Sequence, residues 1–305
     1  MPSEKNFPIR YWLAAARLRT LPLAAATVLC GGLLAALQHA FRADIFLLCL
    51  STALGLQIFS NLANDYGDAQ NGADLGCRQG PPRMVAGGYL SRAAMQRGML
   101  VTALFCCVSG GLLLYRALPV ITHTGLPLWL ALGTACLTAA YRYTAGNKPY
   151  GYLGGGDAAV WLFFGLVGVL GTAYLPSGHL PAYGWLAASA LGLWCTMVLN
   201  LNNMRDIDND RAAGKYTIAA RLGLQRAKGY HALLAAIAAL QWSGWLHFSL
   251  PDSQAVFIPI LLLLTLVHLW QLARLPDSSL DRLLPQWSLT TLLWVALLWL
   301  YHWLS

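Results

Sequence analysis

Residues 183–204 read YGWLAASALGLWCTMVLNLNNM and contain no Asp, Glu, Lys or Arg. A helix needs about 20 mainly apolar residues to cross the roughly 30 Å hydrocarbon core of a bilayer, so this stretch predicts a transmembrane helix. The chain continues as RDIDNDRAAGK (205–215), in which six of the eleven residues are charged. We therefore place the end of this predicted helix at a membrane surface.

Charge-free stretches of this kind recur along the whole chain. Of its 305 residues, 57% are apolar and only 10% are charged, whereas roughly a quarter of the residues in a soluble domain are charged. This composition excludes a water-soluble enzyme and predicts an all-α polytopic membrane protein, a single domain over residues 1–305 with about nine transmembrane helices. The predicted spans are 21–38, 45–64, 98–115, 117–141, 158–181, 183–204, 229–251, 253–273 and 283–305.

The basic residues indicate the orientation of these spans. If the N-terminus is cytoplasmic, the loops after the second, fourth, sixth and eighth spans are cytoplasmic too. Only Arg42 and Arg116 of the 20 Lys and Arg residues then fall on the other side, as the positive-inside rule requires. The net charge of +8 therefore predicts membrane orientation and not nucleic-acid binding, since there is no water-facing domain to carry a nucleic-acid site.

Seven of the twelve acids gather in three cytoplasmic segments, which is notable because carboxylates near a membrane are costly and tend to be functional. They are Asp65, Asp68, Asp74, Asp157, Asp206, Asp208 and Asp210. At about 100° per residue, two sets of side chains each share one helix face. The first set is Asn61, Asn64, Asp65 and Asp68, and the second is Asn202, Asn203, Asp206 and Asp210, with Asp208 pointing away.

Paired carboxylates and amides of this kind suit a hard divalent cation. Mg²⁺ commonly binds through one or two carboxylates and the oxygens of a substrate phosphate, so two facing clusters could hold two Mg²⁺ ions bridged by a diphosphate. Nearby cations that could reach the outer phosphate oxygens are Arg78, Arg83, Lys148, Arg205 and Lys215. The alternative is that each carboxylate is a solvated cap or loop charge, but a cap needs only one acceptor.

The cysteine spacing and the apolar span centres argue against a disulfide-rich or zinc protein and against a transporter. The seven Cys residues lack CxxC spacing and predict neither a disulfide framework nor a zinc site. A transporter would place polar residues near the middle of the membrane. The span centres GGLLAAL (31–37) and LLLLTLV (261–267) are almost bare of them, which favours an enzyme with its site at the cytoplasmic surface.

Four segments carry distinctive motifs: RLRTLPLA (17–24), NLANDYGD (61–68), YRYTAGNKPYGYLGGGD (141–157) and NNMRDIDNDRAAGKYT (202–217). With them the chain resembles the UbiA superfamily of intramembrane aromatic prenyltransferases. The family pattern NDxxDxxxD is met by Asn64, Asp65 and Asp68, but its third acid falls on Gly72, and Asp74 is the nearest candidate. Asp206 and Asp210 meet the second pattern, DxxxD.

The resemblance implies a nine-helix bundle around a central cavity, capped by the three loops. It implies Mg²⁺-dependent transfer of a polyprenyl chain from its diphosphate to an aromatic carbon. The metal ligands would be Asn64, Asp65, Asp68, Asp206 and Asp210, and the diphosphate would meet Lys148, Arg205 and Lys215. Tyr143 and Tyr152 would line the pocket where the allylic cation forms, and Asn61, Arg78, Arg83, Asn202 and Asn203 complete the expected substrate contacts.

Within the superfamily the motifs are most similar to the MenA branch, which prenylates 1,4-dihydroxy-2-naphthoate in menaquinone biosynthesis. This likeness implies a bacterial inner-membrane enzyme that releases CO₂ and diphosphate. Other acceptors, such as 4-hydroxybenzoate or homogentisate, remain open, as do the isoprenoid length and the oligomeric state. A naphthoate acceptor is an anion, and Arg17, Arg19 and Arg142 are the spare cations at the right depth.

Overall fold

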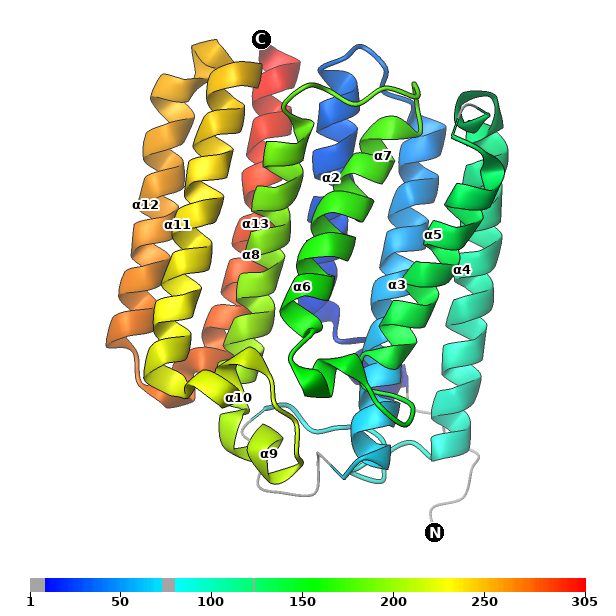
Figure 1. Cartoon of the computed structure of the whole chain (residues 1–305), viewed down its shortest axis with the longest axis vertical. Helices are drawn as coiled ribbons and strands as arrows, with labels where there is room; N and C mark the ends of the chain where they lie inside the picture. Colours follow the sequence, from blue (N-terminus) through cyan, green and yellow to red (C-terminus); the bar gives the residue numbers. More distant parts are fainter. Residues whose placement is uncertain (1–8, 73–79, 123) are drawn as a thin grey trace.

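The computed structural model describes residues 9–72, 80–122 and 124–305, and in these ranges the regular structure is entirely helical. Figure 1 shows long, roughly parallel helices that form one bundle. The α-helices are α1 (Ile9–Ala16), α2 (Leu21–Ala36), α3 (Ala43–Gln70), α4 (Arg92–Ile121), α5 (Leu126–Arg142), α6 (Gly156–Val160), α7 (Gly171–Tyr174), α8 (Gly184–Arg205), α9 (Ile207–Ala212), α10 (Ile218–Leu222), α11 (Leu224–Ser249), α12 (Gln254–Arg274) and α13 (Leu280–Leu304). A π-helical segment, Trp161–Leu170, joins α6 to α7.

Seven helical segments of the described chain are long and apolar enough to cross a membrane. They are Ile9–Ala36, Ala43–Gln70, Arg92–Ile121, Gly156–Tyr174, Gly184–Arg205, Pro251–Arg274 and Leu280–Leu304. The predicted multi-pass helical membrane protein is thereby confirmed, whereas the count of nine is not.

The two remaining predicted spans fall on α5 and α11, which run beside the others in Figure 1. With 17 residues, α5 extends about 26 Å at 1.5 Å per residue, slightly less than the hydrocarbon core. Helix α11 has 26 residues, but His231, Gln241 and Ser243 interrupt its apolar sequence. Helix α5 is therefore too short, and α11 too polar, to be recognised as a membrane-spanning helix from length and composition.

The predicted span 117–141 begins too early. Helix α4 continues past Arg116 to Ile121, and Gly125, with a φ of 81°, precedes α5. The charge of Arg116 does not end the helix, because its guanidinium pairs with Asp44 at 2.7 Å. Arg42 pairs with the same carboxylate at 2.9 Å, so the two basic residues expected on the far side of the membrane lie together.

The first span is broken near its start. Arg17 has a φ of 50°, in the left-handed region, and separates α1 from α2. The side-chain amide of Asn61, on α3, donates to the carbonyl of Ala16 at 2.8 Å and to the hydroxyl of Thr20 at 3.2 Å. Asn61 therefore satisfies backbone and side-chain acceptors that the break exposes.

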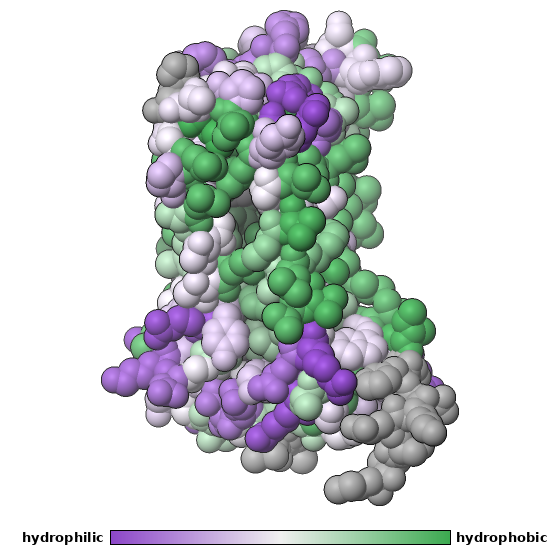
Figure 2. All heavy atoms as spheres, turned by 90° about the vertical axis from the view of Figure 1, so that its right-hand side faces the viewer, coloured by the Kyte–Doolittle hydropathy of each residue, from purple (hydrophilic) through white to green (hydrophobic). Residues whose placement is uncertain are grey.

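The outer face and the interior differ as a membrane protein requires. On the face shown in Figure 2, apolar residues cover much of the middle of the molecule and hydrophilic residues gather at both ends. On α4 the exposed apolar side chains include Leu100, Leu104 and Val108. Inside, α8 approaches the π-helical segment so closely that a Cβ on Gly165 would lie 2.6 Å from the carbonyl oxygen of Ala188, a contact that only a small residue permits.

Candidate active site

The two acidic segments meet at one end of the bundle, where α3 ends and α9 lies (Figure 1). Lys215 links them directly. Its Nζ lies 3.4 Å from Oδ1 of Asp210 and 4.0 Å from Oδ1 of Asp68, and all three side chains are more than nine-tenths buried. Segments that are about 140 residues apart in sequence thus form one charged cluster.

The α3 side of the cluster is held by the segment that follows it. Asp65 accepts hydrogen bonds from the backbone N–H groups of Met84 (2.9 Å) and Val85 (2.8 Å). Asp68 accepts one from Nη2 of Arg83 at 2.5 Å and one from the hydroxyl of Tyr152 at 3.1 Å. Both carboxylates are buried, and each accepts two hydrogen bonds.

The second acidic motif lies on two helices instead of the single continuous helix expected from its periodicity. Asp206 sits at the junction of α8 and α9 with φ near −100°, although the helical bond from the N–H of Asp210 to the carbonyl of Asp206 persists at 2.8 Å. Asp206 and Asp210 are buried and Asp208 is exposed. The prediction that Asp206 and Asp210 share one face and that Asp208 points away is therefore confirmed, in spite of the break.

Arg205 binds Asp206 through two parallel hydrogen bonds, from Nε at 2.8 Å and from Nη2 at 2.7 Å. Nη2 also donates to Oδ1 of Asn202 at 2.9 Å. Such a two-point contact is stronger and more directional than a single ion pair. Two neighbouring oxygens have no hydrogen bond, since Oδ2 of Asp210 and Oδ1 of Asn203 are buried without a donor.

Burial and neighbouring charges shift the pKa values of residues in this cluster. Burial raises the pKa of Asp210 to about 6, against the opposing effect of the Lys215 ammonium. Burial alone would lower the pKa of Lys215, but Asp68 and Asp210 raise it above its ordinary value. The pKa of Tyr143 is raised by burial and by Asp157 and Asp210. Lys215 therefore stays charged and Tyr143 stays neutral near pH 7.

Several predicted site residues lie elsewhere. Lys148 is exposed on its loop, whereas Tyr152 of the same loop is buried. Asp157 is buried but faces α11, where it accepts from the hydroxyl of Tyr230 at 3.1 Å. Arg142 is exposed. Arg78 and Asp74 lie outside the described residues.

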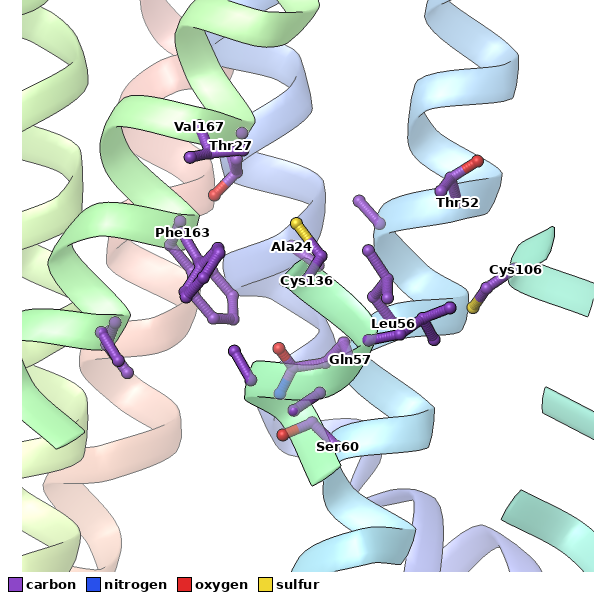
Figure 3. Close-up of a pocket in the computed structure, with 18 of the residues that line it drawn as sticks. Ala24, Thr27, Thr52, Leu56, Gln57, Ser60, Cys106, Cys136, Phe163 and Val167 are labelled. Carbon is purple, nitrogen blue, oxygen red and sulfur yellow. The ribbon is translucent and has the colours of Figure 1, made fainter. Parts of the chain in front are cut away.

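A mainly apolar cavity of about 810 Å³ opens from the charged cluster into the bundle. Asn64, Asp68, Arg83 and Lys215 line it at the cluster. Figure 3 shows its middle, where Ala24 and Thr27 of α2, Leu56 and Gln57 of α3, Cys136 of α5, and Phe163 and Val167 of the π-helical segment face a common space. Most of the cavity wall thus comes from helices in the first two-thirds of the chain, and Leu284 of α13 adds to it.

Some lining residues escaped the sequence analysis. Gln57, Ser60 and Tyr150 all line the cavity, and Gln57 and Ser60 continue the helix face of Asn61 and Asn64 by one further turn toward the membrane. Their helical spacing from Asn61 and Asn64 could therefore have identified them from the sequence. Tyr150 had no such signal, since its edge-to-face contact with Tyr143 (ring centroids 5.5 Å apart) depends on how the 143–155 loop folds.

The model of the UbiA prenyltransferase family matches residues 24–290. The chain belongs to this family. It is similar to the 1,4-dihydroxy-2-naphthoate octaprenyltransferases of Escherichia coli (45% identity, 73% of this chain and 72% of the relative) and Haemophilus influenzae (41% identity, 79% of both). Its fold resembles that of a UbiA homolog from Archaeoglobus fulgidus bound to GPP and Mg²⁺, with a TM-score of 0.65 at 15% identity over 94% of this chain and 98% of the other.

The donor atoms of this UbiA site fit a hard divalent cation. Its acids and amides offer only oxygen ligands, which Mg²⁺ prefers, and Asp210 and Asn203 each keep a buried oxygen without a hydrogen bond. Among the residues that the structure describes, no three His, Cys, Asp or Glu side chains form one metal-binding group. Each ion would therefore need amide, water or phosphate oxygens in addition to the carboxylates.

Proposed function

We propose that this UbiA-family prenyltransferase transfers a polyprenyl chain from its diphosphate to 1,4-dihydroxy-2-naphthoate, with loss of CO₂ and diphosphate. The observation that carries the proposal is the buried Asp68, Lys215 and Asp210 cluster at the mouth of an apolar cavity. The names of the E. coli and H. influenzae relatives support the acceptor. The product would be the demethylated menaquinone precursor.

The charged cluster suits the departure of diphosphate. Breaking the allylic C–O bond places negative charge on the leaving group, and fixed cations aimed at that charge stabilise the transition state more than the ground state. Arg83, Arg205 and Lys215 are buried at the cluster and supply such cations. Asn64, Asp65, Asp68, Asp206 and Asp210 would hold Mg²⁺, which when bound adds Lewis-acid stabilisation of the same charge.

The cavity protects the reacting carbon. An allylic cation must be kept from water, and the apolar walls exclude water from the space next to the cluster. Tyr143 and Tyr150 line the cavity there, and their ring faces can stabilise a nearby positive charge. The isoprenoid tail would extend along the apolar cavity between α2, α3, α5 and the π-helical segment.

The acceptor has to be bound beside the allylic carbon with its carboxylate compensated. Arg17 lines the cavity, whereas Arg19 binds Asp281 at 2.9 Å and Arg142 is exposed. Because Arg17 lines the cavity, it is the one of the three predicted cations that we propose to meet the naphthoate carboxylate. Attack through the carboxylate-bearing carbon then requires loss of CO₂ to restore aromaticity.

The site would face the cytoplasm of a bacterial inner membrane. Only Arg42 and Arg116 of the basic residues are expected at the opposite surface, and the two share Asp44. The positive-inside rule supports this orientation. Both water-soluble substrate groups, the naphthoate and the diphosphate, would then enter from the cytoplasm while the isoprenoid tail enters from the bilayer.

Product analysis tests the proposal. Purified protein in detergent is incubated with Mg²⁺ and geranyl, farnesyl or longer prenyl diphosphates, and with 1,4-dihydroxy-2-naphthoate, 4-hydroxybenzoate or homogentisate. We expect a prenylated naphthalene product, one CO₂ released per product, and reversible loss of activity in EDTA. Retention of a labelled carboxylate, preference for another acceptor, or full turnover in EDTA would contradict the proposed acceptor or the metal requirement.

A further inference from the structure

Asp281 lies outside all the acidic motifs of the sequence, yet it contacts the charged cluster. It is in the first turn of α13, and its Oδ1 accepts from Nη1 of Arg205 at 2.5 Å. The same carboxylate accepts from Nη1 of Arg19, at 2.9 Å to Oδ1 and 3.1 Å to Oδ2. Asp281 thus joins the start of α13 to the end of α8 and to the break between α1 and α2.

The guanidinium of Arg205 is fixed from several sides. Only 2% of its side chain is exposed, and it donates to Asp206, Asn202 and Asp281. The backbone of Gly80 covers it so closely that a Cβ there would lie 2.8 Å from Cζ of Arg205. A buried guanidinium held in this way cannot follow one carboxylate if that carboxylate moves.

The two carboxylates around Arg205 differ in their surroundings. Asp206 is 7% exposed, whereas the side chain of Asp281 is 35% exposed. Asp206 belongs to the motif proposed to bind metal, and Asp281 is on the other side of the guanidinium. A divalent cation held by Asp206 would compete with Arg205 for the same oxygens, and a buried Arg left without a carboxylate would be strongly destabilised.

We propose that Asp281 is a positioning residue that retains Arg205 when Asp206 turns to a divalent cation. The inference rests on the proposed function, because it takes Asp206 as a metal ligand. With Asp281 present, Arg205 keeps a charged partner and stays beside the leaving diphosphate. Without Asp281, Asp206 is the one carboxylate of the described residues that still pairs with Arg205, so a metal ion at Asp206 would have to break that ion pair.

Metal binding without substrate tests this role. Mn²⁺ also prefers oxygen ligands, and its binding to purified protein is measured from the electron paramagnetic resonance signal of free Mn²⁺. We expect Asp281→Asn to weaken Mn²⁺ binding about 10- to 100-fold, the range typical of residues that orient metal ligands. The Mg²⁺ concentration for half-maximal activity should rise in parallel, and Asp281→Glu should restore both quantities.

Two matched variants separate positioning from a general structural role. Arg19→Gln removes the other partner of Asp281 but keeps its contact with Arg205, so Mn²⁺ binding should stay near wild type. Asp277 lies a few residues before Asp281, and its exposed carboxylate pairs with Lys228. Asp277→Asn should also leave Mn²⁺ binding unchanged. Equal losses from Arg19→Gln and Asp281→Asn would mean that the carboxylate only holds helices together and would overturn the inference.

The outcomes also separate this inference from the proposed function. A wild-type protein that neither binds Mn²⁺ nor prenylates 1,4-dihydroxy-2-naphthoate contradicts the proposed function. A wild type that does both, with an Asp281→Asn variant of unchanged Mn²⁺ affinity, contradicts only the role of Asp281. If Asp281→Asn does not give monodisperse protein, Asp281→Ser keeps a small acceptor for Arg205 without the charge and carries the same expectation.

Discussion

Nζ of Lys215 lies 3.4 Å from Oδ1 of Asp210, inside the bundle and away from solvent. The same ammonium is 4.0 Å from Asp68 and 5.5 Å from the centre of the Tyr152 ring. One cation therefore holds together carboxylates from both acidic motifs, which would otherwise repel each other. Its position between the motifs is also where the proposed diphosphate would lie.

Replacing Lys215 by Met should lower kcat/KM for the prenyl diphosphate by at least about a hundredfold, since one contact to developing negative charge is worth about 10²–10³. Steady-state kinetics with a fixed acceptor concentration measure this. Lys228→Met is the control, because Lys228 makes an ion pair with the exposed Asp277 and such pairs contribute little. Comparable losses in both variants would argue against a specific role for Lys215.

The second acidic motif offers an internal comparison. Asp206→Asn should lower turnover by at least about a hundredfold, whereas Asp208→Asn should have a small effect because Asp208 is exposed. The two changes remove the same charge from positions two residues apart, so general electrostatic effects are matched. The turnover numbers of the detergent-purified variants measure both effects. An equal loss of turnover in Asp206→Asn and Asp208→Asn would refute the assignment of the buried face.

Much of the site follows from local periodicity. The 100° step of a helix places Asp206 and Asp210 on a different face from Asp208. This division persists at the break because the N–H of Asp210 still donates to the carbonyl of Asp206. The multi-pass helical fold follows from the length of the charge-free stretches. Both predictions use patterns within a single stretch of about ten to thirty residues. Within such a stretch the helical geometry itself fixes the direction of each side chain.

Contacts between distant segments were less accessible to sequence analysis. Nothing near Asp281 suggested that it would meet Arg205, 76 residues earlier. The family resemblance implied Lys148 on the diphosphate, whereas in the structure Tyr152 of the same loop bonds to Asp68 and Lys148 is exposed. Loop conformation and helix packing decide such contacts, and neither has a repeating pattern along the chain.

Arg17 provides a test of acceptor binding. Arg17→Gln should raise KM for 1,4-dihydroxy-2-naphthoate about tenfold or more, since a hydrogen bond to a charged group contributes about 1.5–3 kcal/mol. KM for the prenyl diphosphate should change much less. Arg142→Gln, on the exposed end of α5, serves as the control. An increase in KM for the prenyl diphosphate alone would mean that Arg17 binds the prenyl donor and not the acceptor.

The length of the cavity predicts how donors of different length respond to a change at its far end. Gly171 lines the cavity at the start of α7, which lies at the opposite end of the bundle from α9 (Figure 1). A Cβ on Gly171 would meet only the Trp129 ring, at 3.9 Å, so Gly171→Leu can fill cavity space without a backbone clash. We expect kcat/KM for long donors to fall at least about tenfold relative to geranyl diphosphate.

Gly229→Leu is the matched control for this change, because Gly229 is exposed on α11 with no atom near its added Cβ. Overpacking costs about 1–3 kcal/mol and lowers the amount of folded enzyme equally for every donor. The ratio of kcat/KM values between long and short donors within one variant is therefore free of folding losses. An unchanged ratio in Gly171→Leu would mean that the isoprenoid leaves the protein before it reaches α7, through the side of the bundle into the bilayer.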